Sequence, residues 1–93
     1  MHAVVVKVSI QDFETARKGL KENVVPAVRQ APGFVAGYWT RSEDGTNGIG
    51  MILFDSEESA NAAKVPIQAG ATDGVTVDNV EVREVVEHAS SQS

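Results

Sequence analysis

The first ten residues hold the sequence feature that most restricts the fold. Val4, Val6 and Val8 recur at a period of two, and their β-branched side chains predict a strand over residues 3–10. Val5 lies on the second face of that strand, so both faces carry apolar side chains. A strand of this kind belongs in the middle of a sheet, with helices on one face and a second layer, such as a partner sheet, on the other.

The next residues predict a helix. Asp12 is a suitable N-cap for this helix. Glu14 would lie in the first helical turn, where the helix dipole favours a negative charge. One face carries apolar residues at three- and four-residue spacing, namely Phe13, Ala16, Leu20, Val24, Ala27 and Val28. Arg17 falls on the other side, which we expect to be solvated. Because Pro26 removes a backbone donor, the helix is expected to kink or restart near residues 23–25.

An aromatic-rich hairpin follows. The Pro-Gly pair at 32–33 stops the helix, and residues 34–41 predict a second strand that holds the only Trp and the only Tyr. The polar residues 42–47 contain an Asp-Gly turn, and residues 48–55 alternate as a third strand.

The register of this hairpin decides what surrounds the Trp. If Trp39 faces Gly50 across the hairpin, Val35 faces Phe54. The glycine would then leave room for the indole ring or for a ligand.

The second half predicts a further helix and a last strand. Ser56, followed by two glutamates, is a strong N-cap for a helix over about residues 57–64, which Pro66 disturbs and which continues only briefly. Valines between residues 75 and 86 make a long strand, and its alternation changes phase near residues 78–79, which predicts a bulge.

The resulting order, β-α-β-β-α-β, is typical of the ferredoxin-like α+β fold, a four-stranded antiparallel sheet with two helices on one face. A chain of 93 residues is one small domain. We expect this domain to span residues 1–88, with 89–93 as a disordered polar tail. The face without helices is too apolar to be left in water, so we expect a homodimer that packs two such faces together.

Composition excludes several classes of function. The chain has no cysteine, which removes disulfides, thiolate metal sites and cysteine nucleophiles. Its net charge is −5, and residues 51–93 carry eight acids against Lys64 and Arg83, which argues against nucleic acid and anionic membranes as partners. No stretch is apolar enough for a membrane span, and no secretory leader precedes the first strand, so a cytoplasmic location is expected.

The whole pattern resembles the dimeric α/β-barrel superfamily, and most closely its antibiotic-biosynthesis-monooxygenase-like branch. The resemblance rests on the element order, on a Pro-containing first helix that runs into Pro32-Gly33-Phe34, on Phe54-Asp55-Ser56-Glu57-Glu58 between the third strand and the second helix, and on a valine-rich last strand. It implies a dimeric barrel. It does not imply one reaction, because such proteins include cofactor-independent oxygenases, haem-degrading enzymes, isomerases, decarboxylases and proteins without known reaction.

The resemblance favours one kind of oxygenase chemistry. Haem-degrading members are similar in using an Asn, a Trp and a helix-borne His, whereas this first strand has no Asn and residues 57–69 have no His. Haem is therefore not expected. Quinone-forming oxygenases, which place Asn, Trp, Tyr and Arg around a polyphenol, fit better through Tyr38, Trp39 and Arg41, and that chemistry implies no metal or bound organic cofactor.

Trp39 and Arg41 are accordingly the candidate substrate-binding residues, while the catalytic residues stay unassigned. An aromatic wall beside a cation suits a planar, anionic or phenolic ligand. In the alternative, Trp39 packs in the barrel or dimer core and Arg41 pairs with an acid near the hairpin. Tyr38 points to the opposite face of the strand and is expected outside the pocket.

Charged groups on the first and last strands offer a weaker hypothesis. Because those strands are antiparallel neighbours in a ferredoxin-like sheet, His2 and His88 come to one edge. Asp55, which ends the third strand, should reach the same edge, where the three could form a metal site or an acid–base pair. Their terminal placement argues against it, and no metal is expected. Lys7 is expected to pair with Glu81.

Two functions remain open. The chain is either a small-molecule-binding protein that acts as a cofactor-independent monooxygenase on an aromatic or phenolic substrate, or a non-catalytic dimeric module that binds a metabolite or a protein partner. In the second case the aromatic residues only seal the interface.

Overall fold

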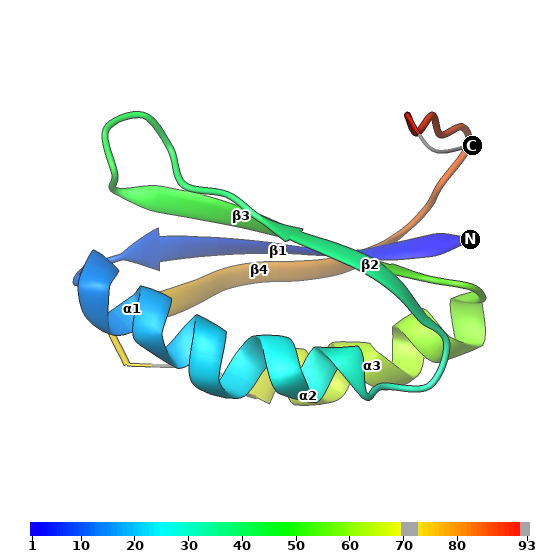
Figure 1. Cartoon of the computed structure of the whole chain (residues 1–93), viewed down its shortest axis with the longest axis horizontal. Coiled ribbons are helices and arrows are strands. Elements are labelled where there is room, and N and C mark those ends of the chain that lie inside the picture. Colours follow the sequence, from blue (N-terminus) through cyan, green and yellow to red (C-terminus); the bar gives the residue numbers. More distant parts are fainter. Residues whose placement is uncertain (70–72, 92–93) are drawn as a thin grey trace.

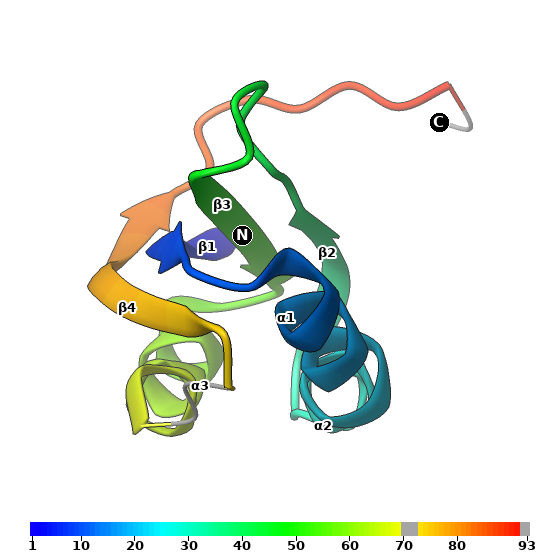
Figure 2. The same cartoon turned by 90° about the vertical axis from the view of Figure 1, so that its left-hand side faces the viewer.

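The computed structural model describes residues 1–69 and 73–91 and has the expected ferredoxin-like α+β fold. Its elements are β1 (His2–Ile10), α1 (Phe13–Gly19), η1 (Leu20–Val24), α2 (Val25–Arg29), β2 (Phe34–Trp39), β3 (Asn47–Phe54), α3 (Glu57–Ala69) and β4 (Val75–Glu84). The strands form one antiparallel sheet in the order β2-β3-β1-β4 (Figure 1). Viewed at right angles, α1 with α2 and α3 lie side by side beneath the sheet, and no helix of the described chain covers its other face (Figure 2).

The valine-rich β1 is a central strand, as predicted. It pairs with β3 on one side and with β4 on the other. Val4 and Val6 belong to the core between the sheet and the helices, while Ala3 and Val5, on the opposite face, are also buried.

The first helix contains a wide turn in front of Pro26. Its start is as predicted, because the backbone amide of Thr15 donates to Asp12 Oδ1 at 3.2 Å. η1 is a π-helical segment in which the amide of Val25 donates to the carbonyl of Leu20, five residues earlier. Proline cannot donate to the helical ladder, and a π turn accommodates the missing bond without ending the helix. The restart predicted at residues 23–25 therefore takes this form.

The hairpin register agrees with the prediction at one end only. Trp39 pairs with Gly50, as expected, but Phe34 and not Val35 pairs with Phe54. The register shifts between residues 34 and 36, so Val35 is an extra residue in β2 and is 47% exposed. The bulge lets the Phe34 ring pack edge-on against Phe54, with the ring centroids 6.4 Å apart.

The second helix begins as predicted and includes the predicted brief continuation. The amide of Ser59 donates to Ser56 Oγ at 3.1 Å, which caps the helix. α3 passes through Pro66 to its end without the expected interruption, because a proline so close to the C-terminus removes only one bond from the last turns.

The last strand has the predicted bulge. Pairing with β1 changes from Lys7–Asn79 to Val8–Val77, which leaves Asp78 as the extra residue. Residues 70–72 of the predicted loop before β4 lie outside the described residues.

The chain after β4 forms no further helix or strand as far as it is described. Of the predicted tail, residues 89–91 have neither, while 92–93 lie outside the described residues. The domain bounds 1–88 stay a prediction. No helix in the described parts of the chain is long and apolar enough to cross a membrane.

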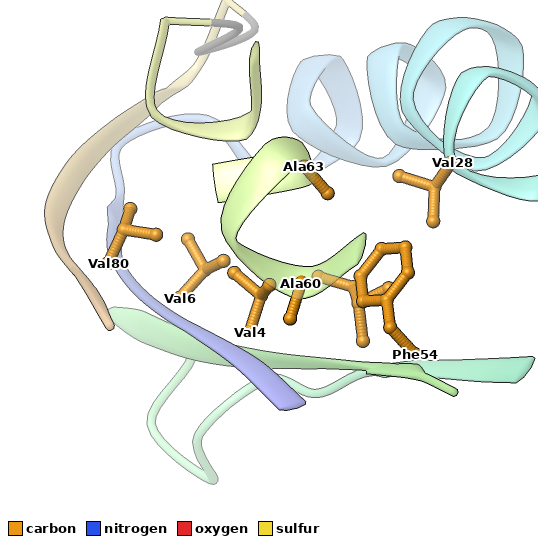
Figure 3. Close-up of a cluster of buried hydrophobic side chains, with 8 residues drawn as sticks. Val4, Val6, Val28, Phe54, Ala60, Ala63 and Val80 are labelled. Atoms are coloured by element: carbon orange, nitrogen blue, oxygen red, sulfur yellow. The ribbon is translucent and has the colours of Figure 1, made fainter. Parts of the chain in front are cut away.

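The core fills only part of the space between helices and sheet. Figure 3 shows Ala60 of α3 beside Val4 and Ala63 above it, with Val28 of α2 pointing towards Phe54. The two alanines let the α3 backbone approach β1, β3 and β4 closely. The first helix stands further from the sheet, and this difference creates the site described next.

Candidate functional site

A cavity of about 600 Å³ lies between the first helix and the helix-facing side of the sheet. Its walls are mostly apolar, with Val8 and Ile10 from the sheet facing Phe13 and Leu20 from the helix, and with Ile67 of α3 also contributing. Volume and lining are typical of small-molecule sites, which are concave, largely apolar and carry a few polar groups.

The indole of Trp39 forms part of the sheet-side wall because two glycines let it lie on the backbone. A Cβ atom at Gly37 would lie 2.7 Å from the ring atom Cη2, and one at Gly50 would lie 3.1 Å from Cδ1. Both distances are shorter than ordinary van der Waals contact. Side chains at these positions would lift the ring into the space that the cavity now occupies.

The polar residues of the cavity wall are Arg17, Asn23, Trp39, Thr40 and Arg41. The Thr40 hydroxyl is engaged, because it donates to the carbonyl of Ile49 at 2.8 Å. The side chains of the other four make no hydrogen bond or ion pair within the described residues. The wall therefore presents two guanidinium groups, an amide and an indole N–H that are free to bind a ligand.

Arg41 packs on an aromatic ring and has no acidic partner within the described chain. Its Cζ atom lies 3.7 Å from the centroid of the Phe13 ring, a cation–π contact. The expected pairing with an acid near the hairpin is therefore not found there. Trp39 combines the two alternatives, since its ring packs against the core and also lines the cavity.

Two nearby carboxylates, those of Asp44 and Asp12, accept hydrogen bonds from residues of their own turns. Asp44 accepts hydrogen bonds from the hydroxyl of Ser42 at 2.7 Å and from the amide and hydroxyl of Thr46, and these bonds lower its pKa to about 2. Hydrogen bonds from Thr15 likewise lower the pKa of Asp12. Both groups stay ionised within their turns, and neither forms an ion pair with Arg41.

Two polar residues of this wall, Arg17 and Asn23, are not predicted by the sequence pattern. Arg17 is exposed, as expected, but it also borders the cavity. The signal was its position four residues after Phe13, which puts both on one helical face. Asn23 reaches the cavity from η1, where the wide turn changes the angular spacing, and Pro26 was the only sequence signal for that turn.

Tyr38 lies outside the cavity, as predicted. It pairs with Met51 on the face that no helix covers and is 63% exposed.

The possible metal site is not assembled, because the described residues contain no group of three potential ligands. His2 Nε2 instead lies 3.3 Å from Glu57 Oε2.

The predicted Lys7–Glu81 ion pair is wrong. The register places Lys7 opposite Asn79 and Glu81 opposite Val5. Glu81 accepts a hydrogen bond from Arg83 Nε at 2.8 Å instead.

Comparison with known proteins supports the fold. No family model matches the chain, and no curated protein matches it either. Among solved structures, it is similar to a monooxygenase from the gene ActVA-Orf6 of Streptomyces coelicolor, crystallised with the ligand nanaomycin D. The TM-score is 0.58 and the identity 17%, over 96% of this chain and 92% of that one. The structure thus confirms the resemblance at the level of the fold: the chain shares its ferredoxin-like α+β architecture with this monooxygenase.

The packing of the indole on the glycines can be tested by a double-mutant cycle. Gly37→Ala should lower the free energy of unfolding by about 1–3 kcal/mol, the usual range for overpacking, because the new methyl group displaces the Trp39 ring. In a Trp39→Leu background the same substitution should cost much less, since the ring is gone. Urea denaturation of the four proteins measures the coupling. An equal cost in both backgrounds would contradict the arrangement.

Proposed function

We propose that the cavity binds a planar aromatic small molecule beside Trp39, and that the protein acts on this molecule as a cofactor-independent monooxygenase. The observation that carries the proposal is the apolar cavity of about 600 Å³, whose wall combines an indole ring with unpaired hydrogen-bond donors. The similar Streptomyces coelicolor monooxygenase, crystallised with nanaomycin D, supports it at the level of the fold.

The wall suggests how such a ligand would be held. An aromatic ring would stack on or near the indole of Trp39, within the apolar cavity between the first helix and the sheet. Arg41 would supply positive charge to an ionised ligand, and the side-chain amide of Asn23 and the indole N–H would donate to its oxygen atoms. Substrate-binding roles for Trp39 and Arg41 are thus part of the proposal.

In the proposed reaction the substrate itself supplies the electrons that reduce O₂. In a hydroxylated anthrone, loss of a proton gives an anion that reacts directly with O₂. The ring CH₂ becomes C=O, one oxygen atom enters the product, and the other leaves as water with the two hydrogens. The substrate supplies all four electrons, and the protein contributes positioning and stabilisation of the anion.

One observation favours the alternative, a ligand-binding module without catalysis. The described residues that line the cavity include no Asp, Glu, His, Lys or Tyr. No side chain of that wall is thus suited to take the substrate proton at neutral pH, and water would have to accept it. A binding protein needs no such base.

Oxygen consumption with a hydroxylated anthrone separates these functions. The wild-type protein should consume one O₂ for each anthrone oxidised, and Trp39→Ala should lower kcat/KM by tenfold or more, equivalent to about 1.4 kcal/mol of transition-state stabilisation. Tyr38→Phe, on the other face of the same strand, is the matched control and should be unchanged. Binding without oxygen consumption would establish the non-catalytic alternative. If the anthrone neither binds nor reacts, the proposal fails.

We also propose that the uncovered face of the sheet binds a second copy of this chain. That face exposes Tyr38, Ile49 and Met51 from two adjacent strands. These side chains form a contiguous apolar patch, unlike the isolated apolar residues that are normal on a protein surface. The central strand has buried apolar residues on the same face, so two sheets packed face to face would continue the core.

The dimer can be tested by sedimentation equilibrium at micromolar concentration. The wild-type protein should be a dimer, and Met51→Glu should be a folded monomer, because the charge would be buried between the sheets. Val65→Glu provides the control, since Val65 is 69% exposed on α3, away from this face. A folded wild-type monomer would defeat the dimer.

A further inference from the structure

The charges around the cavity have one sign. Of the residues that line it, Arg17 and Arg41 are the charged ones, and no lining residue is acidic. This cationic site belongs to a chain whose net charge is −5, so it does not follow from the overall composition. We infer that the ligand is an aromatic acid, a planar ring with a carboxylate group that Arg17 and Arg41 hold together at one end of the cavity.

Both arginines are neighbours of Phe13, Arg41 by direct contact and Arg17 by its position one helical turn later. The guanidinium of Arg41 packs on Phe13, with Cζ 3.7 Å from the ring centroid. Arg17 follows Phe13 by four residues in α1, so the two side chains are neighbours on one helical face. Two elements distant in sequence, the first helix and the chain that follows β2, thus place positive charge at one end of the cavity.

Both guanidinium groups keep their donors free. Neither Arg17 nor Arg41 forms an ion pair or hydrogen bond within the described residues, whereas Arg83 donates to Glu81 at 2.8 Å. The nearby carboxylate of Asp12 is held by Thr15 as the cap of α1. Because the side chains of Arg17 and Arg41 are exposed and unpaired, as most cations of the described chain are, their donors are available to a ligand in the cavity that they line.

A carboxylate matches two arginines better than the other anions that a ring can carry. A phenolate has one oxygen, whereas a carboxylate has two, each able to accept hydrogen bonds from a guanidinium group. Phosphate sites commonly use the free amides of a helix N-terminus, but here Asp12 caps that end of α1. With the carboxylate at the arginines, the ring would lie towards Trp39, and Asn23 and the indole N–H would remain for a ring oxygen.

This inference rests on the proposed function, because it needs a ligand in the cavity, and the test separates the two. The probes are anthraquinone-2-carboxylate and its uncharged methyl ester, which share the ring system. Trp39 is the only tryptophan, so quenching of its fluorescence reports binding beside it. Isothermal titration calorimetry measures both affinities independently.

The wild-type protein should bind the acid at least tenfold more tightly than the ester. Arg17→Gln and Arg41→Gln should each weaken binding of the acid about tenfold, as expected for the loss of a charge-assisted hydrogen bond, and change binding of the ester less than twofold. Arg29→Gln is the matched control, because this arginine of α2 does not line the cavity, and it should have no effect on either probe.

The contrary results separate failure of this inference from failure of the proposed function. Equal affinity for acid and ester would overturn the inference and leave the proposed function standing, whereas failure of both probes to bind would count against both. If Arg29→Gln weakens binding of the acid as much as the two cavity variants do, the acid responds only to the overall charge of the protein, and the inference is wrong. It is also wrong if Arg41→Gln weakens both probes equally, since Arg41 would then act only by packing on Phe13.

Discussion

The contact between the Trp39 ring and the bare backbone of Gly37 and Gly50 is the constraint on which the site depends. A large ring normally projects from a sheet and fills the layer beneath it. Here the absence of two Cβ atoms lets the ring lie against the backbone of the sheet, which leaves space between the ring and the first helix. The fold thus gains an aromatic wall without losing the cavity.

The two halves of the helical layer differ in how they pack on the sheet. On the α3 side, Ala60 and Ala63 allow close approach to the sheet, and the fully buried Phe54, Ile52 and Val4 belong to the same core. On the other side, a π turn and a proline interrupt the regular helix, and polar side chains enter the wall of the cavity. Because Ile52, Phe54 and Ala63 of the core also line the cavity, stability and binding share side chains in this small domain.

Local patterns in the sequence predicted much of this fold. Valine alternation identified the central strand, a change of phase identified the bulge at Asp78, and the register considered for the hairpin paired Trp39 with Gly50. The bulge at Val35 could not be predicted in the same way, because it depends on Phe34 reaching Phe54 in the tertiary core. The same holds for the site: Trp39 and Arg41 were found from strand alternation, whereas Arg17 and Asn23 depend on the path and rotation of the helix.

The central claim is that ligands bind in the cavity and not on the uncovered face of the sheet. Its most direct test is a ¹⁵N–¹H NMR titration of the protein with an aromatic acid. The account predicts that the single indole N–H signal, from Trp39, and the backbone amide of Gly50 shift together and saturate at one equivalent per chain. Shifts confined to Tyr38 and neighbouring residues of the uncovered face, with the indole signal unchanged, would contradict it.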